Sequence, residues 1–264
     1  MLSVDQPDGV YWDHVIDGWA PTLTHRLWRA HSDAVNGRLL QRWLRPGQAT
    51  VLKTDLFDEA VGPGLYPELA ARAEVVVGVD VSPAAVRAAS ERYPDLKAHV
   101  GSVLALPFAD ASLDAVVSNS TLDHFKSHSL IRAAAVELAR TIRPGGQLII
   151  TLDNRMNPVI ALRTSILFGS LHRLGVVPYF VGATHGRRGL AKLLDETGFA
   201  LVEITAIMHC PPQLAASWTS RRGTEHSADT NGRYLQRVLR FEAIEQLPTR
   251  HLTGHFVAAL AVRR

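Results

Sequence analysis

Two polar residues stand at the ends of apolar runs, where a binding site could form. Asp80 follows residues 75–79, which are mostly valine, and Asn119 follows the largely apolar run 113–118. Short β-branched runs of this kind predict buried parallel strands. The carboxyl ends of parallel strands meet at one edge of a sheet, where such sheets bind ligands. At that edge the carboxylate of Asp80 could accept hydrogen bonds from both hydroxyl groups of a ribose.

A simpler role for Asp80 is also open. Ser82 stands at the N-cap position of the helix that follows, and Pro83 is at its first helical position. Asp80 could therefore only help to cap that helix. The order of the segments downstream favours the ribose interpretation.

Seven apolar runs that alternate with helical patterns must position these residues. The predicted strands are 49–55, 75–80, 97–100, 113–118, 147–152, 201–207 and 255–262. Helical segments are predicted at 65–73, 83–93, 131–142, 186–197 and around 231–246. This pattern predicts an α/β fold with a doubly wound, seven-stranded and mostly parallel Rossmann-like sheet, whose ligand sites lie at the strand carboxyl ends.

Length and composition narrow the classes of function. The chain has 264 residues, 47% of them hydrophobic, which is enough for one large domain. Its net charge of +3, from 28 basic and 25 acidic residues, is too balanced to predict a nucleic-acid partner. The single cysteine, Cys210, excludes a disulfide framework and a thiolate cluster, and no His/Cys/Asp spacing predicts a metal site. A reducing cytoplasm fits this cysteine usage.

No integral membrane segment is predicted. The N-terminus lacks the basic start and apolar core of a signal peptide. The most apolar tract, 158–182, is interrupted by Arg163, His172 and Arg173, so it would span a membrane poorly.

Three stretches, in order, resemble the class I methyltransferases that use S-adenosylmethionine (SAM), in particular those acting on small molecules and lipids. GVDVS at 78–82 is similar to the acidic strand end that binds the ribose of SAM. Residues 101–125 follow the family's Gly-Asp-x-x-x-Leu-Pro-Phe…Phe-Asp-x-Val segment almost in register, and 138–151 resemble the helix, Pro-Gly-Gly turn and strand that come next. The resemblance covers 50–152 well and 185–264 loosely. It implies the class I fold, SAM as cofactor and a small-molecule acceptor.

The resemblance also implies cofactor-binding residues. Asp80 and Val81 would lie at the ribose, Ser102 and the backbone N–H of Val103 at the adenine, and Asn119 at the end of the fourth strand. Ser102 departs from the family, which usually has aspartate there. Without a charge, serine would accept the adenine hydrogen bond more weakly.

The largest departure is in the family's first motif, the glycine-rich turn D-x-G-x-G-x-G. Those glycines let the backbone approach the methionine part of SAM closely. Here residues 51–64 read VLKTDLFDEAVGPG, with Lys53 where an acidic residue is usual and no glycine before Gly62 and Gly64. We predict a lengthened loop whose end still reaches the next helix, so that Gly62 and Gly64 stay candidates for cofactor binding.

A carboxylate within that loop could replace the missing acidic residue. Asp55, Asp58 and Glu59 are the candidates to face the ammonium or the sulfonium of SAM. The alternative is a site that no longer binds the cofactor.

The segment after the fourth strand lies beside the transferring methyl group in this family. Its catalytic candidates are His124, whose ordinary pKa is close to neutrality, and Asp123. Both could instead only cap or tether the following helix. Three further polar residues stand at or beyond strand exits: Asp153, His185 and His209.

The predicted domains are a cap and a main domain. Residues 1–48, with tryptophans at 12, 19 and 28 followed by a helical pattern, predict an N-terminal helical cap or lid, although plain core packing by the aromatic rings is the alternative. Residues 49–264 form the methyltransferase-like domain. Its insertions 155–183 and 209–253 are expected near the acceptor, where the apolar first insertion suggests an apolar pocket.

The sequence therefore predicts a SAM-dependent methyltransferase that acts on an oxygen or nitrogen of a small, hydrophobic or amphipathic acceptor. A methyltransferase-like protein without methyl transfer, with a binding or scaffolding role or another use of the fold, is the alternative because the first motif is rewritten. A nicotinamide-dependent dehydrogenase is disfavoured, since no G-x-G-x-x-G follows the first strand to bind a pyrophosphate. The oligomeric state is left open.

Overall fold

A computed structural model describes residues 9–19, 22–164, 182–211 and 228–264 of the chain. Its centre is a seven-stranded sheet in the order β3-β2-β1-β4-β5-β7-β6, in which β7 alone runs antiparallel to its neighbours. The strands are β1 (Gln48–Lys53), β2 (Ala73–Asp80), β3 (Lys97–Val100), β4 (Leu113–Asn119), β5 (Ile142–Asp153), β6 (Phe199–Ile207) and β7 (Phe256–Arg263). The predicted fold class is confirmed.

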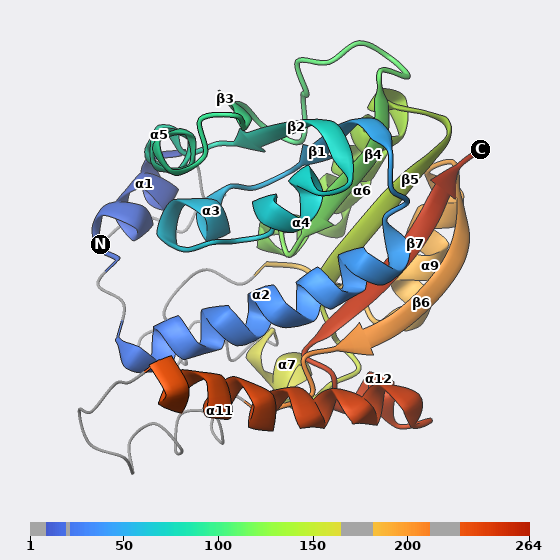
Figure 1. Ribbon diagram of the computed structural model, residues 1–264. Coiled ribbons are helices and arrows are strands. Elements are labelled where there is room, and N and C mark those ends of the chain that lie inside the picture. The colour runs from blue at the N-terminus through green and yellow to red at the C-terminus, as the bar shows by residue number, and fades with distance from the viewer. Residues whose placement is uncertain (1–8, 20–21, 165–181, 212–227) are drawn as a thin grey trace.

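Helices cover both faces of the sheet (Figure 1). The core on one face includes residues of α2 (Leu23–Trp43), α4 (Tyr66–Ala70) and α5 (Pro83–Arg92). The core on the other face includes residues of α6 (His128–Thr141) and α9 (Arg187–Glu196). Val51 and its neighbour Leu52 are both fully buried, one in each core. Because both faces are covered, the central strands are apolar at consecutive positions rather than at alternate ones.

The strand order places the site. From β1 the chain moves to β2 and β3 on one side, and then returns to β4 and β5 on the other. The order reverses between β1 and β4, and the crevice beyond the carboxyl ends at such a switch point is where open α/β sheets bind ligands. Asp80 and Asn119 end the two strands that flank β1.

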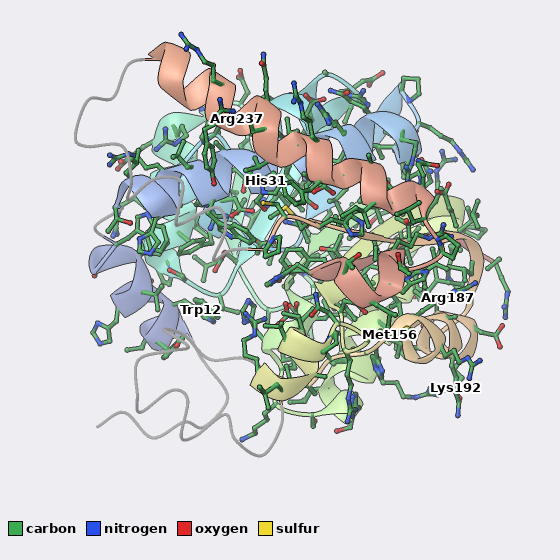
Figure 2. The ribbon with its side chains drawn as sticks, turned by 90° about the horizontal axis from the view of Figure 1, so that it is seen from below. Trp12, His31, Met156, Arg187, Lys192 and Arg237 are labelled. Carbon is green, nitrogen blue, oxygen red and sulfur yellow. The ribbon has the colours of Figure 1, made fainter. Side chains whose placement is uncertain are left out.

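The N-terminal helices lie at this edge and across one face. Helix α1 (Gly9–Asp17) packs against α5, and α2 runs along the sheet with α11 (Ala228–Leu239) beside it (Figures 1 and 2). The remaining short elements are α3 (Phe57–Val61), η1 (Leu122–His124), α7 (Pro158–Arg163), η2 (Arg240–Gln246) and α12 (Arg250–Thr253).

Three local predictions differ from the structure. The segment predicted as a long loop after β1 contains the helix α3, the predicted helix at 231–246 is divided into α11 and η2, and β5 begins at Ile142 instead of Gln147. The central parts of both predicted insertions, 165–181 and 212–227, lie outside the described residues.

Within the described ranges, every helix is too short or too polar to cross a membrane.

Candidate functional site at the carboxyl edge of the sheet

Asp80 ends β2 with its carboxylate held by two backbone donors. The Leu56 N–H donates to Oδ2 at 2.7 Å and the Ser82 N–H donates to Oδ1 at 2.8 Å. The α5 N-cap bond is made by Ser82, whose Oγ accepts the Ala85 N–H at 3.0 Å. Each oxygen of Asp80 thus has one backbone partner and keeps a lone pair for a further donor. Burial raises the pKa of Asp80 to about 6. A ligand group that donates a hydrogen bond to the charged carboxylate would therefore lower this pKa and be bound strongly.

The adenine-side candidates lie next to Asp80. The Gly101 N–H donates to the Asp80 carbonyl at 2.9 Å, which brings Ser102 and Val103 to the end of β2. The Oγ of Ser102 accepts the Leu104 N–H at 3.2 Å, and Val103 is buried in the core below. The carbonyl of Val81 faces Gly9 of α1, where a Cβ would lie 2.3 Å from its oxygen. Helix α1 therefore rests directly on the turn after Asp80.

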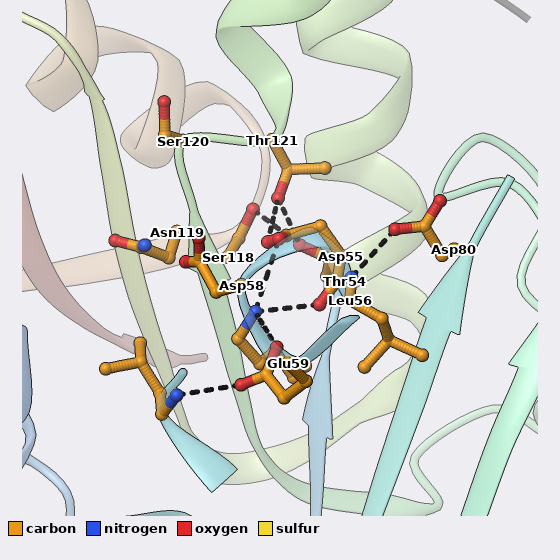
Figure 3. A network of polar contacts seen from close by, with 12 residues as sticks. Thr54, Asp55, Leu56, Asp58, Glu59, Asp80, Ser118, Asn119, Ser120 and Thr121 are labelled. Atoms are coloured by element: carbon orange, nitrogen blue, oxygen red, sulfur yellow. Dashed lines mark hydrogen bonds and ion pairs between the residues drawn. The ribbon is translucent and has the colours of Figure 1, made fainter. Parts of the chain in front are cut away.

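The rewritten first turn is organised by a buried lysine. Lys53 is 1% exposed, and its Nζ lies 2.8 Å from Glu59 Oε2 and 3.2 Å from Asp55 Oδ1 (Figure 3). Burial lowers the pKa of Lys53, but the facing carboxylates of Asp55 and Glu59 outweigh it and raise the pKa above its ordinary value. One ammonium and two carboxylates leave this cluster with one net negative charge.

Asp55 also contacts the strand next to it. The hydroxyl of Thr121 donates to Asp55 Oδ2 at 3.1 Å, and Thr54 lies 2.8 Å from that hydroxyl (Figure 3). The side chain of Asp55 is 20% exposed, whereas that of Glu59 is fully buried. Of the two, only Asp55 can reach a ligand at the edge.

Of the other four candidates of this loop, Glu59 and Gly64 contact each other inside the protein. Glu59 Oε1 accepts the N–H groups of Leu65 and Tyr66, and a Cβ on Gly64, which has φ +60°, would lie 2.5 Å from that oxygen. Position 64 must therefore be glycine, because any side chain there would collide with Glu59. Gly62 is extended, and a Cβ on it would meet only a carbonyl at 3.6 Å.

Asp58 forms an ion pair with Arg29 of α2. Asp58 and Glu59 are therefore both paired inside the protein, which leaves Asp55 as the best placed of the three candidates for the family's acidic residue.

The segment after β4 begins with an unusual backbone. Ser120 has φ +50°, and its N–H donates to the Thr151 carbonyl at 3.1 Å. Its hydroxyl donates to Asp123 Oδ2 at 3.0 Å. Sparsely populated backbone conformations of this kind persist where the surroundings hold them, often at functional sites. Neither the strain nor the Ser120–Asp123 contact had a signal in the sequence.

Asp123 and His124 lie on η1 in different surroundings. Asp123 is 2% exposed, and its Oδ2 accepts the Asp153 N–H at 2.7 Å. Burial first, and then the neighbouring Asp153 carboxylate, raise the pKa of Asp123 to about 6. The His124 ring packs against Trp12 of α1 at a centroid distance of 4.9 Å.

Asp153, at the end of β5, has two side-chain partners that sequence reasoning missed. Arg163 of α7 forms an ion pair with Asp153 Oδ2, and His255 Nε2 lies 3.5 Å from Oδ1. The two other histidines considered have partners elsewhere. The His185 ring packs against that of His128 at a tilt of 40°, and His209 Nε2 lies 2.9 Å from the Ala206 carbonyl. Among the described residues, no group of His, Cys, Asp or Glu side chains is arranged to hold a metal ion.

The residues fit an adenosyl ligand at its ribose end. Asp80 is a buried carboxylate with spare lone pairs at the switch-point edge, and the net negative charge beside it suits a cationic sulfonium. The glycine-lined approach usual for the methionine end is replaced by the Lys53 cluster and α3.

Known proteins share this fold and resemble the central part of this chain in sequence. A family model described as a methyltransferase domain matches residues 57–150, so the match begins just after the rewritten turn. A "probable S-adenosylmethionine-dependent methyltransferase" of Mycolicibacterium smegmatis is 26% identical over 156 residues, covering 59% of this chain and 55% of the relative. The demethylmenaquinone methyltransferase of Beutenbergia cavernae is 35% identical over 127 residues, 47% of this chain and 46% of the relative.

The chain spans about half the length of the curated relatives it matches. Among solved structures, the geranyl diphosphate C-methyltransferase of Streptomyces coelicolor A3(2), in complex with Mg²⁺, geranyl diphosphate and S-adenosyl-L-homocysteine, superposes with a TM-score of 0.57 at 15% identity. That alignment covers 87% of this chain and 77% of the other. At this identity the likeness concerns the fold.

Proposed function

Because this chain belongs to the class I SAM-dependent methyltransferase family, we propose that it transfers the methyl group of SAM to an oxygen or nitrogen of a small, hydrophobic or amphipathic acceptor. The observation that carries the proposal is the Asp80 carboxylate, buried at the end of β2 with spare acceptor capacity on each oxygen. Bound SAM supplies an electrophilic methyl group on a sulfonium.

The cofactor-side roles follow from placement along the edge. Asp80, fixed by the N–H groups of Leu56 and Ser82, accepts the ribose hydroxyls, and Val81 shapes the turn beside it. Ser102 and the Val103 N–H serve the adenine, since both follow the strand next to Asp80. Asp55 turns its partly exposed carboxylate toward the positive charge of the cofactor.

Several observations support an apolar acceptor. On and just before α7, beyond the end of β5, the side chains of Met156, Val159 and Leu162 are 41%, 61% and 55% exposed. The Beutenbergia relative is named for an acceptor, demethylmenaquinone, whose class would suit such a surface. We place the protein in the cytoplasm, which agrees with a chain that has a single, buried cysteine.

The direct test titrates the purified protein with S-adenosylhomocysteine (SAH) and with NAD⁺ by calorimetry, followed by a radiolabelled-SAM transfer assay on hydroquinone, phenol and amine acceptors. Micromolar SAH binding together with transfer supports the proposal. SAH binding without transfer to any acceptor favours the binding or scaffolding alternative. NAD⁺ binding in place of SAH would favour a dehydrogenase.

For proton removal from the acceptor, the two candidates give different results. Asp123→Asn should reduce kcat about 100-fold and remove the acidic limb of the kcat–pH profile, if Asp123 takes the proton through the Ser120 hydroxyl that donates to it. That limb should lie near pH 6, the value to which burial raises the pKa of Asp123.

His124→Ala is the matched comparison, because it changes the adjacent residue of the same short helix. A near-normal kcat for Asp123→Asn with a large loss for His124→Ala would transfer the role to His124. The measurement uses saturating SAM, so that titration of Asp80 does not contribute to kcat.

We also propose that residues 1–48 act as a lid, since α1 contacts both sides of the site. Asp13 bonds to the Ser82 hydroxyl and accepts the Ala84 N–H at 3.0 Å, while Trp12 packs on His124. Asp13→Ala should increase the dissociation rate of SAH about fivefold, measured by stopped flow. Asp17→Ala, an exposed position on the same helix, is the control; equal rates for the two variants would contradict a lid.

A further inference from the structure

Aliphatic side chains gather on an outer surface formed by α7 and α12, at the lower end of the molecule in Figure 1. Four residues there are between 41% and 61% exposed. They are Met156, Val159 and Leu162, on and just before α7, and Leu252 of α12. Val159 and Leu162 are three positions apart, so they share one side of their helix. We call these four residues the apolar ridge.

Packing and hydrogen bonds hold the apolar ridge in this orientation. Asn157, at the N-cap of α7, donates from Nδ2 to the carbonyls of Thr253 and Gly254 at 3.1 and 3.2 Å. These bonds join the start of α7 to the end of α12. Ile160, which is 1% exposed, anchors the opposite side of α7 in the protein. The aliphatic side chains therefore face outward because of how the two helices are packed.

The start of α9 places positive charge next to the apolar ridge. Arg187 and Arg188, its first two residues, are both exposed. A Cβ on the preceding residue, Gly186, would lie 2.9 Å from Met156 Cγ, so the start of α9 touches the ridge. Figure 2 views the molecule from this side and shows Met156 and Arg187 close to each other.

Helix α11 adds further arginines on the same side. Arg233 and Arg237 are exposed and four positions apart on α11, and exposed Arg240 follows at the start of η2. Figure 2 shows α11 crossing this side of the molecule and labels Arg237. The glutamates of η2 are directed inward. Glu242 accepts two backbone N–H groups just after β6, and Glu245 forms an ion pair with an arginine of α2.

The segments that carry the apolar ridge contain no acidic residue. Neither 154–194 nor 246–264 includes an aspartate or a glutamate, although the whole chain has 25 acidic residues. These segments contain α7, α12 and all of α9 except its last two residues. The arginines beside the ridge are therefore not balanced by acidic neighbours in the sequence, and this side of the molecule attracts anions.

We propose that this side of the molecule docks on an anionic lipid surface. The apolar ridge enters the boundary of the acyl chains, while the arginines of α9 and α11 contact the phosphates of the headgroups. A bilayer satisfies both features together, because burial of aliphatic side chains and attraction to anionic lipids add in interfacial binding. Exposed apolar surface rimmed by polar residues is typical of such sites.

The inference goes beyond the proposed function and does not depend on methyl transfer. It has a consequence for the acceptor, however. Helix α7 begins five residues after Asp153, which ends β5 at the ligand-binding edge of the sheet. Docking through α7 would bring that edge close to the bilayer, so that an apolar acceptor dissolved in the membrane is within reach.

The test measures cosedimentation of the full chain with two kinds of lipid vesicle. One is phosphatidylcholine alone, and in the other about one third of the lipid is phosphatidylglycerol. The wild type should bind the anionic vesicles about tenfold or more tightly than the neutral ones. Sodium chloride at about 0.5 M should remove most of this difference, because salt screens exposed charges.

Two variants, each with a matched control, assign the binding to this surface. Val159→Asp should weaken binding to the anionic vesicles about tenfold or more, since an aliphatic side chain is lost and a negative charge is added. Val136→Asp makes the same change at a 50% exposed valine of α6, outside the apolar ridge, and should bind like the wild type.

Arg187→Glu should weaken binding to the anionic vesicles about tenfold or more, because a charge that attracts the headgroups becomes one that repels them. Lys97→Glu makes the same reversal at an exposed residue of β3, the edge strand at the other end of the sheet, and should have no effect. Circular dichroism checks that all four variants are folded.

Three results would overturn the inference: a wild type that binds neither kind of vesicle, equal binding to both kinds, or a folded Val159→Asp protein that binds like the wild type. If the wild type binds no vesicle and light scattering finds a dimer that Val159→Asp separates, the apolar ridge is covered by a second copy of the chain. Vesicle binding is measured without SAM, so its failure is distinguished from failure of the proposed function.

Discussion

Replacing Lys53 with methionine should lower the free energy of unfolding by about 3–5 kcal/mol, which is the usual cost of removing one partner from a buried ion pair. Lys53 and Glu59 are 1% and 0% exposed, and Nζ lies 2.8 Å from Oε2. Without the ammonium, the Glu59 carboxylate keeps only the N–H groups of Leu65 and Tyr66. Urea unfolding followed by circular dichroism measures the change.

Two further variants make this result specific. Lys53→Met combined with Glu59→Gln should recover most of the loss, since removing both charges leaves no uncompensated ion. Lys192→Met removes a surface ion pair, in which Lys192 Nζ lies 3.7 Å from Glu196 Oε1. Lys192 is 77% exposed and extends away from the molecule (Figure 2), so this change should lower the free energy of unfolding by less than about 0.5 kcal/mol. Equal losses for Lys53→Met and Lys192→Met would contradict the structural role of the buried lysine.

Replacing Asp80 with alanine should weaken SAH binding about 100-fold or more, because two hydrogen bonds to a charged acceptor are lost. Asp95→Ala, an exposed acidic residue before β3, should leave the affinity unchanged. Because Asp80 also holds the Leu56 N–H, thermal unfolding must show that Asp80→Ala stays folded at the temperature of the titration. Unchanged SAH affinity in a folded Asp80→Ala protein would remove Asp80 from the site.

The pH dependence of binding follows from the same carboxylate. Burial raises the pKa of Asp80 from 3.8 to about 6, so the folded protein without ligand holds this proton more tightly than the unfolded chain does. The contribution of Asp80 to stability is therefore largest below pH 3.8 and falls as the pH rises to about 6. Ribose hydroxyls favour the charged form, so SAH affinity should rise between pH 5 and pH 7 and then level off.

Much of the fold could be predicted because its signals are local. Residues 76–79 before Asp80 are buried, so this part of the strand is an unbroken apolar segment instead of an alternating one. Ser82 and Pro83 mark the start of α5, and the structure has the cap at that residue. The antiparallel direction of β7 left no such signal, since direction depends on which neighbours a strand pairs with.

The first turn could not be predicted because its partners are distant or unusual. The absence of glycines suggested an open, lengthened loop, but the Lys53–Glu59 pair closes it and α3 fills it. Asp58 pairs with Arg29, which is 29 positions earlier in the chain, and periodicity does not report such contacts.

A crystal structure of the protein grown with SAH tests the central claim most directly. We expect the two ribose hydroxyls within hydrogen-bonding distance of the Asp80 carboxylate, with Leu56 still donating its N–H to the same group. A ligand whose ribose lies elsewhere, or a cleft in which Phe57 and Asp58 leave no room for the nucleoside, would contradict it.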